Sequence, residues 1–231
     1  MSGVFLDFDG SLSPIVRHPL EARPAPGVRR ALAALVGHFR LVAVVTGRRA
    51  EEAERLLGVP GVRYEGLYGM EGAVAAAVPG LAAAARSAAT GVPEAWVEDK
   101  GVTVSVHYRG AADPPEARRR LADSLEHVAR SHGLVVVEGK MVLELVPPGR
   151  PMKGETVKRL AGENDLEGVF FAGDDVADLD AFRAVEDLAE RGLTTLKVAV
   201  RGDETPPELV VGADVAVDGP EGLVDLLDQL T

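Results

Sequence analysis

The sequence predicts an α/β fold in which a parallel sheet, covered by helices, carries a small inserted α+β module. Short apolar runs alternate with helical patterns at both ends of the chain, as in parallel sheets whose strands are joined by helices. The middle of the chain shows period-two alternation and a short hairpin turn, which are typical of antiparallel strands. A chain of 231 residues needs no disulfide, metal staple or oligomeric partner in order to fold, so a monomer is expected.

The first part of the chain predicts three strands and two helices. The clearest helix carries Val28, Leu32, Leu35 and Val36 at the three-to-four spacing of a helix buried on one face, and Pro26 lies near its start. The predicted elements are a strand at 4–8, a helix at 26–39, a strand at 41–46, a helix at 50–57 and a strand at 62–67.

The same alternation resumes late in the chain. It predicts a helix at 153–160, a strand at 169–172, a helix at 179–190, strands at 196–200 and 215–217, and a final helix at 220–230. Together with the first part, these elements form the core domain, which is predicted over residues 1–79 and 150–231.

The middle of the chain predicts a module of another kind. Gly139 and Lys140 form a short turn of the type that joins antiparallel strands. The predicted elements are a helix at 82–89, a strand at 102–108, a helix at 115–131 and strands at 134–138 and 141–146. Pro- and Gly-containing segments at 79–80 and 147–149 mark hinge-like limits, so the inserted module is placed at 80–149, where it can act as a lid.

The charge and the composition exclude several classes of protein. A net charge of −11, with no run of five or more Lys and Arg, argues against nucleic-acid binding. The apolar runs fall far short of the roughly 20 residues of a membrane-spanning helix, and the N-terminus lacks a secretory signal, so a soluble cytoplasmic protein is expected. The absence of Cys excludes a disulfide framework, a thiolate zinc site and a cysteine nucleophile.

Two carboxylates, Asp7 and Asp9, follow the first apolar strand and precede Gly10. Side chains two residues apart point to the same side of a strand, and ligands of open α/β sheets bind beyond the carboxyl ends of the strands. Both acids are therefore expected to face the crevice, where they repel one another unless a cation or a proton lies between them. The alternative is a strand that simply runs out into a polar turn.

A second acidic cluster, Asp174, Asp175 and Asp178, follows the strand at 169–172. Carboxylates from separate strands at one sheet edge suit a hard divalent cation such as Mg²⁺. The alternative is that these acids cap the next helix, and Asp178 could do both. The two clusters together favour a magnesium site.

Two further residues suit a phosphate at the same edge. Thr46 ends the second strand and offers a hydroxyl. Lys153, one of only five lysines, lies at the start of a helix, where a cation is unfavourable unless an anion lies in front of it. An ordinary surface lysine is the alternative.

In this order along the chain, the motifs resemble those of the haloacid dehalogenase superfamily of phosphohydrolases, which has a Rossmann-like core. The finer sequence resembles the trehalose-6-phosphate phosphatase family over nearly the whole chain. The segments that carry this resemblance lie at 6–15, 45–48, 66–71, 97–109, 139–144 and 173–182.

The resemblance implies four catalytic residues: Asp7 as the nucleophile, Asp9 as acid and base, and Thr46 and Lys153 as ligands of the phosphoryl oxygens. It also implies a Mg²⁺ cofactor. Its ligands would be Asp7, the backbone carbonyl of Asp9 and Asp174, with Asp178 and Asp175 in support.

The sugar-binding positions that the resemblance implies lie mostly in the inserted module, and a solvated charged face is the alternative for them. They are Glu98, Lys100, Arg109, Lys140 and Glu144, together with Arg48 of the core. Trp96, His107 and Tyr108 are interpreted as packing or supporting residues.

The function that the resemblance implies is hydrolysis of a small sugar phosphate, trehalose 6-phosphate, as the last step of trehalose biosynthesis. A phosphatase of another sugar phosphate, of the sucrose or glucosyl type, and a catalytically silent sugar-phosphate sensor are the alternatives. The sequence departs from the family pattern at Ser11, where Thr is usual, and at Ala177 and Leu179, so weaker metal binding or activity, or a broader substrate range, is expected.

Overall fold

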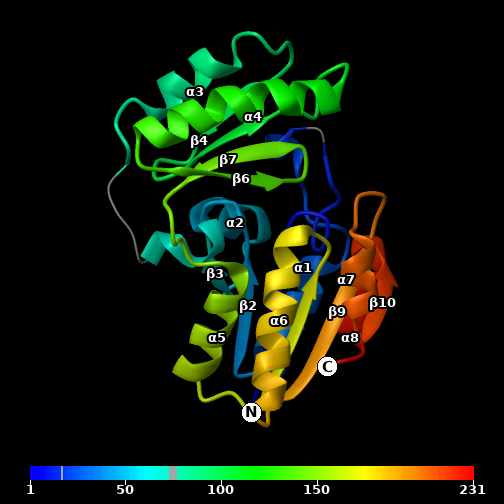
Figure 1. Cartoon of the computed structure of the whole chain (residues 1–231). Helices are drawn as coiled ribbons and strands as arrows, with labels where there is room; N and C mark the ends of the chain where they lie inside the picture. The colour runs from blue at the N-terminus through cyan, green and yellow to red at the C-terminus, as the bar shows by residue number, and fades with distance from the viewer. Residues whose placement is uncertain (17, 73–76) are drawn as a thin grey trace. The chain divides into compact units, whose positions relative to one another are not determined.

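The structure is a computed structural model that describes residues 1–16, 18–72 and 77–231 (Figure 1). It divides into two compact units, a core unit of Met1–Gly72 with Pro151–Thr231 and an inserted unit of Ala73–Arg150. The sequence placed the limits of the inserted module at 80 and 149. Because residues 73–76 lie outside the described residues, the first of these limits stays a prediction.

The core unit contains a six-stranded parallel sheet with the strand order β10-β9-β8-β1-β2-β3, which confirms the predicted fold class. Its strands are β1 (Ser2–Leu6), β2 (Leu41–Val45), β3 (Arg63–Glu65), β8 (Gly168–Gly173), β9 (Thr194–Arg201) and β10 (Val215–Asp218). Since β1 pairs with both β2 and β8, the turns after these three strands meet at one edge of the sheet.

Helices cover both faces of this sheet. They are α1 (Val28–His38), α2 (Ala50–Leu57), α5 (Lys153–Glu163), α6 (Val176–Glu190), α7 (Pro207–Gly212) and α8 (Gly219–Asp228), with a short 3₁₀ turn, η1 (Pro19–Glu21), after β1 and another, η2 (Leu67–Gly72), after β3. Val4 and Leu6 pack in one apolar cluster with Leu32 of α1, whereas Phe5 packs in a second with Val157 of α5. Burial of both faces explains why the core strands read as continuous apolar runs. In Figure 1, α5 and α6 lie in front of the sheet.

The main differences from the predicted core elements lie at strand and helix ends. Strands β1 and β2 end at Leu6 and Val45, so the polar residues that follow them lie in turns. Helix α6 begins at Val176, three residues earlier than predicted, because Asp175 caps it. Helix α7 was not predicted, since its six residues are too few to show a helical period.

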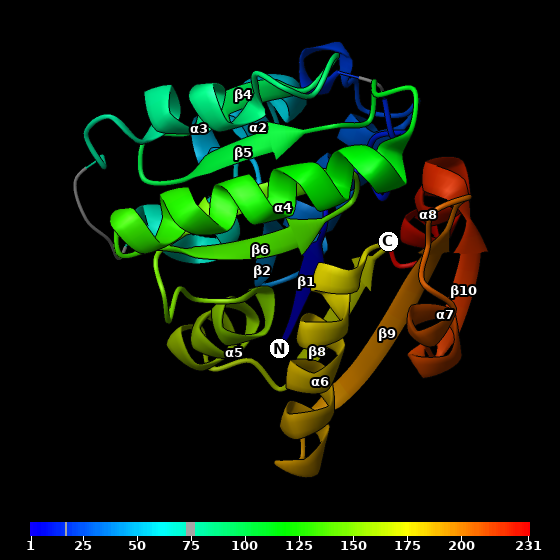
Figure 2. The ribbon, with the colours of Figure 1, turned by 45° about the horizontal axis from the view of Figure 1, so that its top comes forward.

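The inserted unit is a four-stranded antiparallel sheet of order β4-β5-β7-β6, with α3 and α4 packed on it (Figure 2). Its elements are α3 (Leu81–Ala89), β4 (Trp96–Asp99), β5 (Val104–His107), α4 (Pro114–Ser131), β6 (Val135–Gly139) and β7 (Val142–Val146). The predicted β-α-β-β order thus lacked one strand, β4. Gly139 still pairs with Val142, so the hairpin turn is formed by Lys140 and Met141, one residue later than predicted, with φ of 55° at Met141.

Among the described residues, no helix combines the length and the apolar character that a bilayer span requires.

Candidate active site

A buried lysine lies between two buried carboxylates at the carboxyl edge of the core sheet. Lys153 is the first residue of α5, and its Nζ donates to Asp7 Oδ1 at 2.5 Å and to Asp178 Oδ1 at 2.6 Å. Asp7 follows β1, where its backbone N still donates to Ala172 O at 2.9 Å, and Asp178 lies in the first turn of α6. All three side chains are at least 93% buried. The structure therefore brings together two residues predicted as catalytic and one predicted as a metal ligand.

The electrostatics of this cluster set unusual protonation states. Burial raises the pKa of Asp7 well above its ordinary value, Lys153 opposes this, and the nearby charges of Asp178 and Asp174 add to it. Burial lowers the pKa of Lys153, but the charges of Asp178 and Asp7 outweigh that effect, so its pKa lies well above the ordinary value. Lys153 therefore favours its charged form, and it also favours ionised Asp7, whereas burial and the neighbouring carboxylates favour neutral Asp7.

A third carboxylate completes a possible metal site. Among the described residues, Asp7, Asp174 and Asp178 each place one oxygen so that these oxygens lie within 4.8 Å of one another. Ser11 Oγ donates to Asp174 Oδ1 at 3.2 Å, so the hydroxyl that Ser11 shares with the more usual Thr is in use. Gly10, at φ of 94°, allows this approach, because a Cβ there would overlap the Asp174 carboxylate.

The residues present fit a divalent cation. Three carboxylates face one ammonium group, which leaves a surplus of two negative charges in a buried site. Oxygen ligands of this type are those that Mg²⁺ prefers. Asp178 has both carboxylate oxygens in hydrogen bonds to Lys153 and to backbone N atoms, so it is the least suited of the three as a direct ligand.

Asp178 contacts both the backbone at the start of α6 and Lys153 of the buried cluster. Its Oδ2 accepts from the backbone N of Asp174 at 2.9 Å and from that of Asp175 at 2.8 Å, while Oδ1 accepts from Lys153. Asp175 is the N-cap of α6. The helix-cap interpretation of Asp175 and Asp178 is therefore confirmed, and the metal-ligand interpretation of these acids stays a prediction.

The N-terminus of α5 has an anion of its own. Gly154 N donates to Asp180 Oδ2 at 2.8 Å, and Met152 N donates to Glu155 Oε2 at 3.3 Å. The anion inferred in front of Lys153 is thus supplied in part by carboxylates of this chain. Asp180 was not among the predicted site residues, because nothing in its spacing shows that α6 packs its carboxylate against α5.

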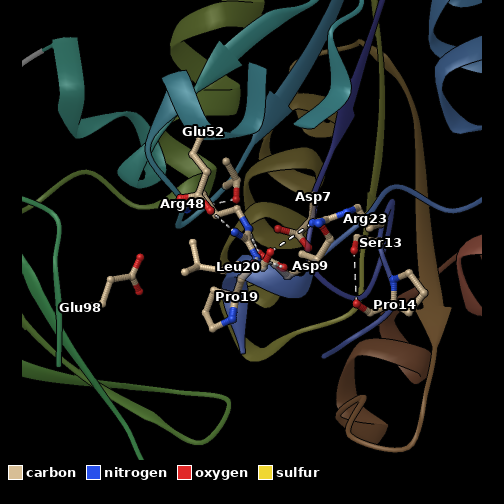
Figure 3. Close-up of polar contacts among 12 residues, drawn as sticks. Asp7, Asp9, Ser13, Pro14, Pro19, Leu20, Arg23, Arg48, Glu52 and Glu98 are labelled. Atoms are coloured by element: carbon tan, nitrogen blue, oxygen red, sulfur yellow. Dashed lines mark hydrogen bonds and ion pairs between the residues drawn. The ribbon is translucent and has the colours of Figure 1, made fainter. Parts of the chain in front are cut away.

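Asp9 is held by a different cation. Arg48 Nε donates to Asp9 Oδ2 at 2.7 Å and Arg48 Nη2 donates to Asp9 Oδ1 at 2.8 Å, so the contact is bidentate. Arg48 also contacts Glu52 and donates to Pro19 O at 3.1 Å (Figure 3). Its guanidinium carbon lies 5.2 Å from the centre of the Phe8 ring. Burial lowers the pKa of Arg48, but the hydrogen bond and charge of Asp9 outweigh this and raise it.

This pairing was missed at the level of sequence. Asp7 and Asp9 were expected to face one crevice, but β1 ends before both, and each carboxylate contacts its own cation. Glu52 lies four residues after Arg48. This spacing could have indicated the Arg48–Glu52 ion pair, but not the contact between Arg48 and Asp9.

Thr46 is fully buried in the turn after β2. Its Oγ1 accepts from Arg48 N at 3.2 Å, and its backbone N donates to Glu65 O at 3.0 Å. Tyr68 N donates to Thr46 O at 2.9 Å, and the Tyr68 ring centre lies 5.6 Å from Lys153 Nζ. Tyr68 therefore links the two residues predicted to bind phosphoryl oxygens.

The inserted unit carries a separate charged cluster on one face of its sheet. The strand register aligns Glu98 of β4 with Ser105 of β5, and Ser105 with Glu144 of β7. Glu144 Oε1 accepts from Lys100 Nζ at 3.0 Å and from Ser105 Oγ at 2.7 Å, and Lys100 Nζ lies 3.8 Å from Glu98 Oε2. Two of the predicted sugar-binding residues, Glu98 and Glu144, thus both contact a third, Lys100. Burial raises the pKa of Glu144, but Lys100 and Ser105 outweigh this and lower it.

Arg109 and Lys140 form a second group at the hairpin turn. Arg109 Nη2 donates to Lys140 O at 3.3 Å. His107 stacks on Trp96 with ring centres 4.1 Å apart, and its Nε2 contacts Glu98 Oε2 at 2.8 Å. His107 therefore contacts two other residues of the inserted unit, and its supporting role stays a prediction. Ser105 was not predicted, because the register that places it beside Glu144 depends on strand pairing.

The family model for trehalose-phosphatase matches residues 5–77 and 81–208. A trehalose-phosphate phosphatase of Mycobacterium avium (strain 104) is 34% identical over 247 aligned residues, which cover 98% of this chain and 61% of that protein. A trehalose-phosphate phosphatase of Mycobacterium leprae (strain TN) is 35% identical, and the alignment covers 79% of this chain and 47% of that protein. The chain thus spans about three-fifths or less of the length of these relatives.

Solved structures support the fold. A trehalose-6-phosphate phosphatase related protein is 27% identical with a TM-score of 0.75, covering 99% of this chain and 96% of that one. The C-terminal domain of a Candida albicans trehalose-6-phosphate phosphatase has a TM-score of 0.81 at 21% identity, covering 99% and 91%. A haloacid dehalogenase-like hydrolase from Bacteroides thetaiotaomicron has a TM-score of 0.68 at 13% identity, covering 100% and 99%. The core sheet with its inserted antiparallel unit therefore has the fold of haloacid dehalogenase-like hydrolases, and the chain belongs to the trehalose-phosphatase family.

Proposed function

We propose that this chain is a Mg²⁺-dependent phosphatase that hydrolyses trehalose 6-phosphate to trehalose and phosphate. The observation that carries the proposal is the buried cluster of Asp7, Lys153, Asp178 and Asp174 at the carboxyl edge of the core sheet, in a chain of this family. A buried surplus of negative charge beside a fixed ammonium group suits a metal ion and a phosphoryl group together.

Asp7 is proposed as the nucleophile. A carboxylate oxygen of Asp7 attacks phosphorus, the bond from phosphorus to the sugar oxygen breaks, and an aspartyl-phosphate forms. Lys153 Nζ, 2.5 Å from Asp7 Oδ1, is positioned to keep this carboxylate ionised and to stabilise charge on the phosphoryl oxygens. Thr46 is proposed to contact a second phosphoryl oxygen from the turn after β2.

Asp9 is proposed as the acid and base. It gives a proton to the departing sugar oxygen and later takes one from the water that attacks the aspartyl-phosphate, which restores Asp7 and releases phosphate. Arg48 holds both oxygens of Asp9, so it fixes the orientation of this carboxylate between the two steps. We therefore propose Arg48 as a residue that positions Asp9 as well as one near the substrate.

Mg²⁺ would be held by Asp7 and Asp174, with the backbone carbonyl of Asp9 and with Asp178 in support. When bound, this ion supplies positive charge that favours ionised Asp7 and neutralises the phosphate. Ser11 keeps Asp174 in place by its hydrogen bond to Oδ1.

The inserted unit is proposed to recognise the sugar. Glu98, Lys100 and Glu144 present charged groups of both signs on one sheet face, and Arg109 and Lys140 add cations near the hairpin. Such groups pair with sugar hydroxyls, which both donate and accept hydrogen bonds.

A panel of sugar phosphates tests the substrate. Phosphate release is measured for trehalose 6-phosphate, sucrose 6-phosphate and glucose 6-phosphate, each with Mg²⁺ and with EDTA. We expect trehalose 6-phosphate to have the highest kcat/KM by about tenfold or more, and EDTA to abolish all turnover. Equal rates on the three sugars would contradict the proposed specificity.

A further inference from the structure

The segment Gly66–Glu71, which follows β3, is a motif to which the proposed chemistry assigns no role. Its backbone is unusual, because Leu67, Tyr68 and Gly69 take φ values of 50°, 59° and 95° in succession. The left-handed region is sterically costly for Leu and Tyr, and such costs persist where the surrounding structure enforces them.

Two backbone hydrogen bonds connect this segment to the turn that carries Thr46. Leu67 N donates to Arg48 O at 2.8 Å and Tyr68 N donates to Thr46 O at 2.9 Å. The Tyr68 hydroxyl lies against Gly47, where an added Cβ would approach it to 2.7 Å. The backbone and the side chain of Tyr68 thus both contact this turn.

Tyr68 also contacts residues of α5. The hydroxyl of Thr156, a residue 2% exposed, donates to Tyr68 O at 2.7 Å. Gly69 lies so close to this hydroxyl that a Cβ would overlap it. Lys153, three residues before Thr156 on the same helix, has its Nζ 5.6 Å from the Tyr68 ring centre. The ring and the backbone of Tyr68 therefore both lie between β2 and the first turn of α5.

We propose that Gly66–Glu71 is a brace that fixes the separation of Thr46 and Lys153, with Tyr68 as its positioning residue and the Thr156 hydroxyl as its anchor on α5. This inference rests on the proposed function, in which Thr46 and Lys153 hold oxygens of one phosphoryl group. The two residues come from different elements, and small errors in their separation weaken their joint contact with the transition state. The strained backbone of the segment is explained by the need to contact both elements within three residues.

Thr156→Val tests the brace. The substitution keeps the shape of the side chain but removes the hydroxyl that anchors Tyr68 O. We expect kcat/KM on trehalose 6-phosphate to fall about tenfold, and the inhibition constant of inorganic phosphate to rise by a similar factor. Thr156→Ser keeps the hydroxyl and is expected to restore both values to within about twofold.

A matched control is Thr205→Val. Thr205 Oγ1 donates to Val200 O at 3.0 Å in the core unit, so this variant loses a similar hydrogen bond, and neither value is expected to change. If Thr156→Val does not fold, Tyr68→Leu, which removes the ring and hydroxyl contacts, is expected to give the same two changes.

The outcomes separate the brace from the proposed function. An active wild type with an unchanged Thr156→Val variant, or equal losses in the Val and Ser variants, would overturn the brace alone. A wild type that hydrolyses no sugar phosphate would overturn the proposed function. Calorimetric binding of inorganic phosphate to wild type and Thr156→Val would then decide the brace, since equal affinities would overturn it.

Discussion

The two acids of the first motif differ in what holds them. Asp7 is buried against Lys153, whereas Asp9 has a side chain 36% exposed and contacts Arg48 with both oxygens. A nucleophile needs a fixed, ionised carboxylate, and an acid needs one that exchanges protons with solvent and substrate. The surroundings therefore differ: Asp7 is fixed by Lys153, although burial raises its pKa until a further cation binds, whereas Asp9 is partly exposed and is oriented by Arg48.

Arg48→Lys tests the orientation of Asp9. A lysine cannot make the bidentate contact, so Asp9 loses its fixed orientation while the local charge is kept. We expect kcat to fall by about 100-fold. The control is Arg49→Lys, since the Arg49 side chain is 55% exposed and its nearest ion-pair contact, to Glu71, is 3.6 Å long. A kcat equal to that of wild type in both variants would argue against a role for Arg48 in positioning Asp9.

Single residues also show how far sequence reasoning reaches. Asp7, Lys153 and Asp174 could be placed at one edge because each follows a strand or starts a helix whose position in a parallel sheet is fixed by topology. The partner of Asp9 could not, because spacing gives the side on which a residue lies but not which cation reaches it. Ser105 and Asp180 were missed for a related reason, since both act through packing between elements.

At the scale of elements, the long apolar patterns were predicted well and the short ones poorly. The six core strands were all predicted, and the central ones, β1, β2 and β8, are apolar runs because both of their faces are buried. Strand β4, Trp96–Asp99, has two acids among its four residues and too few apolar positions to reveal an alternation. The η2 turn requires positive φ values at Leu67 and Tyr68. Leu and Tyr seldom adopt such φ values, so the sequence does not predict this turn.

The sheet of the inserted unit carries a buried ion pair that makes its stability dependent on pH. Because the folded unit lowers the pKa of Glu144, ionised Glu144 stabilises it at pH values above the pKa of the unfolded chain. This contribution is lost as the pH falls through the lower folded value. Glu144→Gln removes the nearer of the two carboxylates beside buried Lys100, and we expect the free energy of unfolding to fall by about 3 kcal/mol at pH 7.

Denaturant unfolding across a pH series measures this effect. The difference between wild type and Glu144→Gln is expected to be constant near neutral pH and to shrink as the pH falls below about 4.3, the pKa of an unfolded glutamate, because the unfolded chain then takes up the proton first. A Glu138→Gln variant is the comparison, because Glu138 pairs with Arg118 of α4 and both side chains are nearly half exposed. A difference that is independent of pH down to about pH 2 would contradict the assignment to Glu144.

At the scale of the whole molecule, the net charge of −11 offers no long-range attraction for an anionic substrate. The charges matter by their position, since three acids converge on one buried site beside Lys153. A bound cation there reverses the local sign and makes the site suitable for a phosphate.

Metal binding is therefore expected to stabilise the whole core unit. Saturating Mg²⁺ should raise the Tm by roughly 5–10 °C. Because burial raises the pKa of Asp7, the metal-free chain loses stability as the pH rises toward that raised value, and the cation replaces the proton. The increase in Tm with Mg²⁺ should thus be larger at pH 7.5 than at pH 5.5.

Asp174→Asn is expected to lose this increase in Tm, and Asp187→Asn, on the exposed part of α6, to keep it. Thermal unfolding with Mg²⁺ and with EDTA gives both values. An equal increase in the two variants would place the metal elsewhere.

The central claim is that Asp7 attacks the phosphorus of trehalose 6-phosphate. The most direct measurement is the rate of phosphate release from this substrate by wild type and by Asp7→Asn, with binding of the substrate followed in parallel by calorimetry. We predict that the variant still binds trehalose 6-phosphate while its kcat falls by about 10⁴-fold or more. Turnover by the variant within about tenfold of wild type, or binding by both proteins with turnover by neither, would contradict the claim.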